Sequence, residues 1–572
     1  MNMSVAQTGY PSIDRTHLQG IDESVLNPTT FPISLLALFQ YINQHDMDAV
    51  AIDRDDKSYT RRQLNDDSLI LAKGLCLFDL APGEKLTIAT PNLYEGIAFS
   101  MAANAVGIRF TYANDLGEPS QLIEQLSDEL NLHESGAVVI YEKDEQFADE
   151  LFARAPRLRH VINIKPSGSR NSANYGLTPE VRYIDYETFK ELSAASDLDI
   201  SARIEEYSKS DQDAFYLQTS GSTSGRPKSL IFGNEAVFAT LMYAKNSTGT
   251  DTHDKNVSKV LCILPYRLPY GWMTIFVNLI GGNRVELATG ASPKDIGRYY
   301  LTEASYIYGT PLIFRNFMDE TPPDADLSSL KAFFCSGFAI SEEWYQEGTT
   351  YLRMHGSKGE IRNNYGIGEA LCIGTASDGI PHRPGTSGKF YVGPKWVIVD
   401  DNGNEVKYDE PGEVLVSSRS LFRGYYKDPE ATAKAFVEYK GERYFRTGDY
   451  LKLSRDGYVT FLGRKKRFYQ PLGATDKVNC ETIERALMKE IDIVNTCAVV
   501  IYSPDGKHET SKAFVVPRKP KSPSPELRNK LFARIKETLL QYQLPSDIEF
   551  LEKIPVMESG KINYPLLEKM CN

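Results

Sequence analysis

The stretch Thr219-Ser220-Gly221-Ser222-Thr223-Ser224-Gly225-Arg226-Pro227-Lys228 decides how this chain is to be understood. It follows the apolar run Phe215-Tyr216-Leu217-Gln218, which is typical of a buried strand. Its glycines, hydroxyl side chains, arginine and lysine make a pliable loop that is rich in hydrogen-bond donors. A loop of this kind after a strand suits the binding of a polyphosphate. The sequence therefore predicts a nucleotide site at this loop.

Two other interpretations of the loop fit less well. A flexible Ser/Gly linker rarely follows a strand and rarely closes on Arg226-Pro227-Lys228. The phosphate loop of the P-loop NTPases needs an adjacent Gly-Lys pair followed by Ser or Thr. Here Arg226 and Pro227 separate Gly225 from Lys228, so that class of nucleotide site is excluded.

The bulk properties of the chain limit its class. A chain of 572 residues is too long for one core, so we expect several domains. The net charge of −12 argues against nucleic acid or an anionic membrane surface as the main partner. The seven cysteines contain no Cys-x-x-Cys pair, which indicates reduced thiols and not a disulfide framework. Because neither a secretory signal nor a membrane-length apolar run is present, we expect a cytoplasmic protein.

Predicted strands and helices alternate along most of the chain. We expect helices over residues 32–44, 66–77 and 93–106, and strands over residues 85–90, 136–141 and 161–164. A second alternating unit covers residues 260–337, and short Gly-bounded strands follow at 412–416 and 422–426. The pattern predicts an α/β fold with largely parallel sheets covered by helices, followed by a β-rich subdomain.

Further motifs follow in a fixed order. They are Asn364-Tyr365-Gly366-Ile367-Gly368-Glu369, Thr447-Gly448-Asp449, Gly463-Arg464-Lys465-Lys466 and Gly560-Lys561. Together with the loop at Thr219 they resemble the motifs of the AMP-forming adenylating enzymes. This superfamily includes acyl-CoA synthetases, aryl-acid ligases, luciferases and peptide-synthetase adenylation domains. The resemblance extends from about Ser58 to Asn563.

The resemblance implies a domain organisation. Residues 1–463 would form a large N-terminal AMP-binding domain, made of two helix-covered mixed or parallel sheets and a distorted β-barrel subdomain. Residues 464–466 would be a hinge with Lys466 as its pivot, and residues 467–572 a small mobile α+β lid. No carrier or reductase module follows, so we expect a stand-alone ligase.

The resemblance also implies an activity. The enzyme would use ATP and Mg²⁺ to activate a small carboxylic acid as its acyl-adenylate, with release of pyrophosphate. The acyl group would then pass to the thiol of CoA or to the phosphopantetheine of a separate carrier protein. Two alternatives stay open: an amine as the acceptor, which would make an amide ligase, and a catalytically impaired homologue that binds a nucleotide or acyl ligand.

Each site residue is assigned by its match to a family motif. The loop residues would hold the leaving pyrophosphate together with Lys228; they are Thr219, Ser220, Gly221, Ser222 and Thr223. Around the nucleoside, Tyr365 beside Gly366 would stack on adenine and Asn364 would bond its edge. Asp449 would accept hydrogen bonds from the ribose hydroxyls, with Arg464 near the ribose or phosphate. Glu369 would bind Mg²⁺ as a hard oxygen ligand. Lys561 would bridge the substrate carboxylate and the α-phosphate.

The acid pocket is predicted from four residues, Tyr270, Trp272, Gly309 and Gly337. Amino-acid-specific members of the family usually carry an Asp near the first two, and this chain has none there. That absence favours an aryl or aliphatic acid over an α-amino acid. A Tyr-Trp pair is equally typical of a plain hydrophobic core.

Three features depart from the family pattern. The phosphate loop is one residue longer between Thr223 and Pro227, and Gly368 stands where a Thr usually contacts the α-phosphate. Two extra residues follow Gly473, in the segment that meets the incoming thiol in the family. These departures motivate the impaired-homologue alternative, and they leave the acceptor step dependent on the resemblance alone.

Overall fold

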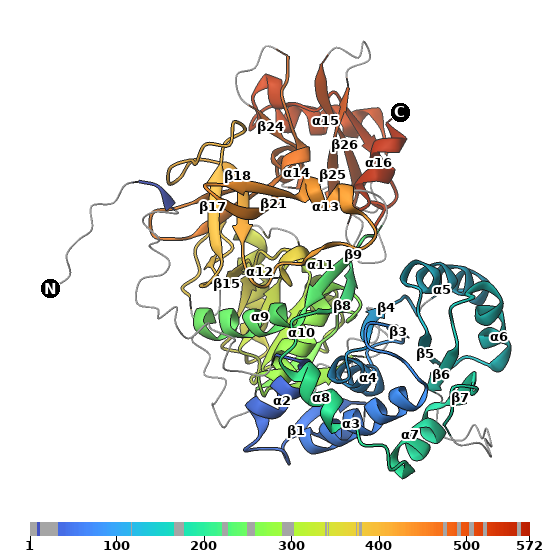
Figure 1. The fold of residues 1–572 in the computed structure, drawn as a ribbon. Helices are drawn as coiled ribbons and strands as arrows, with labels where there is room; N and C mark the ends of the chain where they lie inside the picture. The colour runs from blue at the N-terminus through green and yellow to red at the C-terminus, as the bar shows by residue number, and fades with distance from the viewer. Residues whose placement is uncertain are drawn as a thin grey trace.

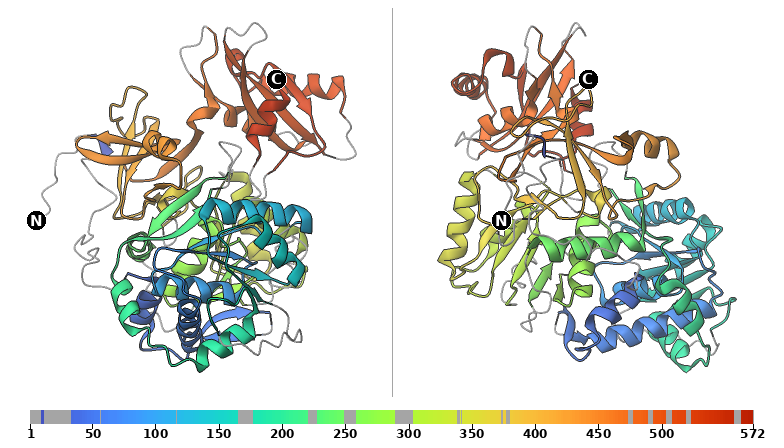
Figure 2. Two further views of the ribbon diagram at one scale, coloured as in Figure 1. Left: turned by 45° about the vertical axis from the view of Figure 1, so that its right-hand side comes forward. Right: turned by 60° about the vertical axis from the view of Figure 1, so that its left-hand side comes forward.

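The structure is a computed structural model, and Figure 1 shows its fold. It describes residues 9–11, 33–55, 57–115, 117–164, 177–219, 227–248, 258–288, 303–337, 340, 342–372, 374–376, 380–472, 477–488, 493–502, 508–518, 523–556 and 562–571. Two sheets and their helices form one end of the molecule. A β-rich subdomain and the C-terminal segment form the other end (Figures 1 and 2).

The first sheet carries the predicted nucleotide loop. Its eight strands are ordered β19-β9-β8-β4-β3-β5-β6-β7. The parallel members are β3 (Lys85–Ala89), β4 (Arg109–Tyr112), β5 (Ala137–Tyr141), β6 (His160–Ile164), β7 (Tyr183–Asp185) and β8 (Asp213–Gln218). The antiparallel members are β9 (Ser229–Gly233) and β19 (Gly424–Tyr425). Because β8 and β9 form a hairpin, residues 219–228 connect two hydrogen-bonded strand ends.

The second sheet has seven strands, in the order β14-β13-β12-β10-β11-β1-β2. The strands are β1 (Val50–Arg54), β2 (Lys57–Thr60), β10 (Lys259–Cys262), β11 (Arg284–Leu287), β12 (Tyr306–Gly309), β13 (Ala332–Cys335) and β14 (Glu360–Asn363). All pair in parallel except β2, which pairs antiparallel with β1. The carboxyl ends of β12, β13 and β14 therefore meet at one edge of the sheet, where the motif from Asn364 begins.

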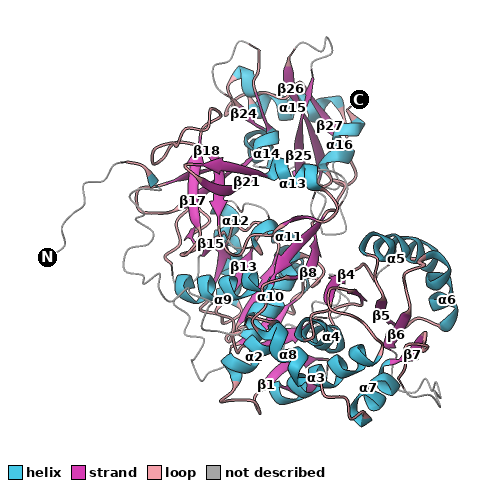
Figure 3. Ribbon diagram, viewed as in Figure 1, coloured by secondary structure: helices cyan, strands magenta, loops and turns pink. Residues whose placement is uncertain are grey.

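Helices cover both sheets, as Figure 3 shows. They are α2 (Leu35–Asn43), α3 (Arg61–Leu77), α4 (Tyr94–Ala105), α5 (Pro119–His133), α6 (Glu145–Arg154), α7 (Tyr186–Ala195), α8 (Ser201–Ser208), α9 (Asn234–Thr248), α10 (Pro269–Ile280), α11 (Pro311–Glu320) and α12 (Glu342–Met354). α3 begins earlier than the expected residue 66, because Thr60 and Gln63 form a capping box at its N-terminus. Among the described residues no helix is both long and apolar enough to cross a membrane.

The expected β-rich subdomain is a five-stranded antiparallel sheet. It consists of β17 (Lys395–Val399), β18 (Gly412–Ser417), β20 (Phe436–Tyr439), β21 (Glu442–Leu453) and β22 (Val459–Arg464). A two-stranded ribbon, β15 (Thr375–Ala376) and β16 (Lys389–Phe390), and the helix α13 (Pro429–Ala435) accompany it. The Thr-Gly-Asp motif lies inside β21 and not in an isolated turn, and Gly448 has a φ of +67° there.

The segment after β22 has its own core. Its elements are the 3₁₀ turn η6 (Lys465–Arg467), β23 (Phe468–Tyr469), β24 (Val478–Asn479), α14 (Cys480–Met488), β25 (Ile493–Tyr502), β26 (Glu509–Pro517), α15 (Pro525–Ile535), η7 (Gln541–Gln543), β27 (Asp547–Phe550) and α16 (Tyr564–Met570). Residues such as Ile483, Leu531 and Ile548 form a buried cluster within this segment. A separate core is what a distinct lid requires. The exact hinge at 464–466 stays a prediction.

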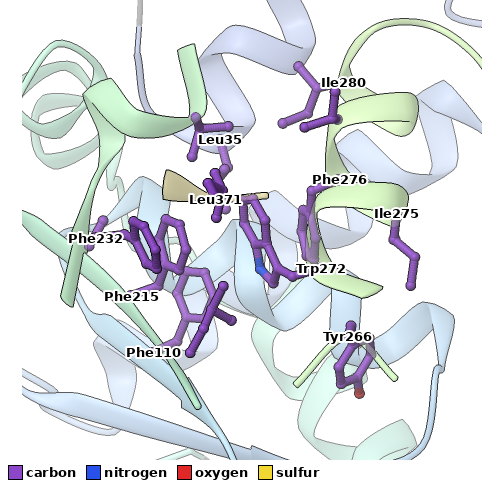
Figure 4. Packing of buried hydrophobic residues seen from close by; sticks show 14 of the residues in the cluster. Leu35, Phe110, Phe215, Phe232, Tyr266, Trp272, Ile275, Phe276, Ile280 and Leu371 are labelled. Atoms are coloured by element: carbon purple, nitrogen blue, oxygen red, sulfur yellow. The ribbon is translucent and has the colours of Figure 1, made fainter. Parts of the chain in front are cut away.

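An aromatic stack lies in the core between the first sheet and α10 (Figure 4). Trp272 is fully buried, and its ring lies parallel to those of Phe215 and Phe276, with centroids 4.5 Å away in each case. Aromatic side chains in such packing contribute mainly through the apolar area that they bury. The stack joins α10 to the strand that leads into the nucleotide loop.

We expect Trp272→Ala to lower the free energy of unfolding by about 3–5 kcal/mol, because it leaves a large cavity in a packed core. Urea denaturation measures the change. Tyr270→Phe on the same helix removes only a half-buried hydroxyl and serves as the control. A tryptophan that lined a ligand pocket would instead change substrate binding and leave the stability nearly unaltered.

Candidate functional site

The base of the nucleotide loop is closed by two hydrogen bonds, one between backbone groups and one to a side chain. The N–H of Thr219 donates to the carbonyl of Lys228 at 2.8 Å, and the N–H of Lys228 donates to Oγ1 of Thr219 at 2.9 Å. The β8–β9 pairing, in which Gln218 lies opposite Ser229, positions both residues. The predicted contacts of Ser220, Gly221, Ser222 and Thr223 fall outside the described residues.

Tyr425 connects Lys228 to Glu369. The Lys228 Nζ lies 4.6 Å from the centroid of the Tyr425 ring and 3.6 Å from Oδ2 of Asp428. The Tyr425 hydroxyl donates to Oε1 of Glu369 at 3.1 Å. Burial and the nearby Glu369 carboxylate raise the pKa of Tyr425, so its hydroxyl keeps its proton and remains a donor. The predicted phosphate lysine and metal carboxylate thus both contact the side chain of Tyr425.

Sequence reasoning missed the role of Tyr425, which it placed only in a short strand. The pairing of β19 with β9, the strand that follows the nucleotide loop, brings Tyr425 to the site. Strand pairing over such a sequence separation cannot be derived from one sequence without a template.

Two residues predicted to surround the nucleoside contact the carboxylate of a third, Asp449. Asp449 is 3% exposed, and its Oδ2 accepts a hydrogen bond from the Tyr365 hydroxyl at 2.7 Å. Its Oδ1 lies 3.0 Å from Nε of Arg464. The β21–β22 register places Asp449 directly opposite Arg464, and Arg464 also donates to the carbonyl of Thr447 at 2.9 Å. Burial and the Asp449 charge raise the pKa of Tyr365, which therefore stays a hydroxyl donor.

The residues around Tyr365 lie between two strand ends. The N–H of Asn364 donates to the carbonyl of Cys335 at 2.9 Å, which fixes the end of β14 beside the end of β13. A Cβ on Gly366 would lie 2.8 Å from the backbone oxygen of Cys372, so only glycine fits there. A Cβ on Gly368 would lie no closer than 3.5 Å to Pro269. Packing therefore leaves room for a β-carbon at Gly368.

The acid-pocket residues divide between two environments. The Tyr270 hydroxyl donates to the carbonyl of Phe334 at 3.4 Å, and its ring meets the ring of Tyr308 edge-on at 6.5 Å. Gly309 ends β12, and Gly337 follows β13 with a φ of +96°. Tyr270 therefore lies with Gly309 and Gly337 at the strand ends. The structure places Trp272 in the aromatic core, because residues two apart on a helix face different sides.

The start of the lid is tied to the large domain by ion pairs. Asp401 accepts hydrogen bonds from the Tyr450 hydroxyl and from Nζ of Lys477, both at 2.5 Å. Nζ of Lys465 lies 3.1 Å from Asp401 and 3.0 Å from Glu413. These contacts hold the pKa of Asp401 well below its usual range. Lys466, the predicted pivot, is exposed beside them.

The predicted catalytic lysine, Lys561, lies outside the described residues. The residues that flank its segment form an antiparallel bridge, Val556 with Ile562. Its assignment therefore rests on the sequence motif.

The chain is similar to known proteins over most of its length. The AMP-binding enzyme family model matches residues 39–426, and the model of the AMP-binding enzyme C-terminal domain matches residues 482–561. Pyochelin synthase PchD from Pseudomonas aeruginosa is 25% identical over 524 residues, covering 90% of this chain and 88% of that protein. 4-Coumarate–CoA ligase 3 from Arabidopsis thaliana is 24% identical over 573 residues, covering 98% of this chain and 94% of that protein.

A solved structure shows the same fold. The anthranilate CoA ligase AuaEII, crystallised with anthranoyl-AMP, superimposes with a TM-score of 0.77 at 19% identity, covering 96% of this chain and 99% of that chain. The predicted α/β architecture, with a large N-terminal domain and a smaller C-terminal domain, is thereby confirmed. The predicted superfamily and the predicted class of AMP-forming ligase are confirmed as well: the chain belongs to the AMP-binding enzyme family.

Proposed function

We propose that this enzyme uses ATP and Mg²⁺ to convert a carboxylic acid into its acyl-adenylate, releases pyrophosphate, and passes the acyl group to the thiol of CoA or of a carrier-protein phosphopantetheine. The observation that carries this proposal is the convergence of Tyr365, Asp449 and Arg464 beside the hairpin with the nucleotide loop. A buried carboxylate with an aromatic ring and a guanidinium beside it suits a ribose and its base.

The residues fit the parts of ATP in order. Tyr365 and Asn364 would contact adenine, Asp449 and Arg464 the ribose, and Lys228 with the loop from Thr219 the phosphates. Both reactants are anions, so fixed positive charge and exact alignment are the main contributions that such a site can make. Lys561 would supply the charge between the carboxylate and the α-phosphate. The lid would then turn about Lys466 to admit the thiol.

Glu369 fits Mg²⁺ as a single protein carboxylate. No group of three or more His, Cys, Asp and Glu side chains within the described residues could hold a metal ion. Mg²⁺ at a nucleotide site is commonly bound by one or two carboxylates together with the substrate phosphates, so one glutamate is a sufficient protein contribution. Tyr425 fixes the orientation of this carboxylate through its hydrogen bond to Oε1.

We expect Glu369→Gln to raise the Mg²⁺ concentration needed for half-maximal activity by about tenfold, since it removes one charged oxygen ligand. Titrating MgCl₂ at fixed ATP measures the shift. Tyr425→Phe keeps the carboxylate and loses only its orienting hydroxyl, so a smaller shift is expected there. An unchanged Mg²⁺ dependence in Glu369→Gln would show that another group binds the ion.

The surroundings of Tyr270 favour an uncharged acid side chain. Burial raises the pKa of Tyr270, and the titratable groups that contribute next are Tyr308, Cys335, Cys372 and Tyr391. None of these four side chains is a carboxylate. A substrate ammonium would find no carboxylate among them, which supports an aryl or aliphatic acid over an α-amino acid.

The experiment that tests the proposal is acid-dependent exchange of pyrophosphate into ATP, run with Mg²⁺ and a panel of aryl, fatty and amino acids. A parallel assay follows AMP release with and without CoA. Exchange with one acid and a CoA-dependent rise in AMP would support a CoA ligase. Exchange without any effect of CoA would favour a carrier protein or an amine as acceptor. No exchange with any acid would favour the impaired homologue.

A further inference from the structure

The last turn of α5 packs against the base of the nucleotide loop. His133 is fully buried, and its Nε2 lies 3.1 Å from Oγ of Ser229, the first residue of β9. Glu129 lies one turn earlier on the same face, with Oε2 3.7 Å from Nε2 of His133. The side chain of Gln218, the last residue of β8, lies near enough to Glu129 to favour the charged form of its carboxylate. Gln218 and Ser229 are the paired residues from which the loop leaves the sheet.

The helix therefore contacts both strand ends of the loop with polar side chains. His133 also stacks on Tyr426, with ring centroids 4.9 Å apart and planes at 9°. The N–H of Tyr426 donates to the carbonyl of Ser229 at 2.8 Å, so the same histidine supports Ser229 through two contacts. Tyr426 directly follows Tyr425, which contacts both Lys228 and Glu369.

Burial of polar atoms of His133 and Glu129 lowers the stability of the fold. Within the described part of the chain, Nδ1 of His133 and Oε2 of Glu129 are buried without a hydrogen-bond partner. Burial, followed by the charges of Lys85 and Lys427, lowers the pKa of His133 to about 3, so the ring is neutral. Apolar residues would pack an ordinary helix face against a sheet at lower cost. Packing alone therefore does not explain why Glu129 and His133 occupy these positions.

We propose that Glu129 and His133 are positioning residues for the nucleotide loop, holding Gln218 and Ser229 so that the loop binds the phosphates of ATP and pyrophosphate. This inference rests on the proposed function of the loop. Neither residue touches the reacting atoms. Their loss should therefore weaken the binding of ATP and pyrophosphate and leave the acid site and the chemical step intact.

Steady-state pyrophosphate exchange tests the proposal with His133→Leu, His133→Gln and Glu129→Gln. For His133→Leu we expect the KM values for ATP and for pyrophosphate to rise by about tenfold, the size of one lost hydrogen bond. The KM for the acid and kcat should change by less than about twofold. His133→Gln can still donate to Ser229 and should recover most of the loss. Glu124→Gln, on the exposed side of α5, is the matched control.

A pH profile adds a readout that a merely structural role would not move. Burial raises the pKa of Glu129 to about 7, although the nearby Gln218 side chain opposes this rise. The charged groups near the pair are Lys85, Lys427 and Asp128. As the pH rises through about 7, Glu129 gains a negative charge beneath the phosphates, so the KM for ATP of the wild type should rise. In Glu129→Gln this part of the profile should be flat.

Two results would overturn the inference. One is that the KM values of His133→Leu for ATP and pyrophosphate equal those of the wild type. The other is that kcat falls and the KM values for all substrates rise together, with a lower melting temperature. If the wild-type protein shows no pyrophosphate exchange with any acid of the panel, that result would instead contradict the proposed function. In that case calorimetric titration with ATP alone still tests the pair. Equal ATP affinity in wild type and His133→Leu would then reject it.

Discussion

Asp449→Ala should raise the KM for ATP by about 10²–10³-fold, because a buried carboxylate that bonds two ribose hydroxyls contributes about 3–4 kcal/mol. Asp449 is the centre of the proposed nucleoside site. Its carboxylate is almost fully buried and holds Tyr365 on one oxygen and Arg464 on the other. The variant therefore loses the ribose contacts and leaves two neighbours without their partner.

Pyrophosphate exchange at varied ATP, with a saturating acid, measures this effect. Asp456→Ala is the matched control, since Asp456 is an exposed aspartate that pairs with Arg383 on the surface. Thermal unfolding separates a local loss from a general one. A KM for ATP within about threefold of wild type, in a folded variant, would show that Asp449 serves only to hold Arg464 and Tyr365.

Lys561→Ala should lower the rate of adenylate formation by about 10²–10³-fold, the size of effect seen when one preorganised group at a developing charge is removed. The two anions would then approach without a cation between them. The binding of ATP should change little, because Asp449 and the loop remain. Single-turnover pyrophosphate release measures the chemical step directly.

The control for this variant is Lys553→Ala, an exposed lysine on the same side of the hinge. Thiol transfer from a supplied acyl-adenylate gives a second readout, because the lysine would act only in the first half-reaction. Undiminished adenylation in Lys561→Ala would reject the assignment. Slowing of both half-reactions by the same factor would point to a misfolded lid.

The sequence by itself determined the class of fold, the order of the motifs and the identity of the family. The alternation of strands and helices and the loop at Thr219 are local patterns, and local patterns are visible in one chain. Element boundaries followed local chemistry as well: the capping box of Thr60 and Gln63 sets the start of α3, which simple periodicity placed later.

Only the tertiary structure decided which side chains meet. Tyr365 and Asp449 are 84 residues apart, and Tyr425 and Glu369 are 56 apart, yet each pair forms a hydrogen bond. These contacts depend on strand register and sheet order, which no local pattern encodes. No local pattern shows that Trp272 faces the core while Tyr270 faces the strand ends. Nor does a local pattern show that His133 packs against Ser229 at the base of the loop. Burial and long-range pairing, not residue type, give these side chains their roles.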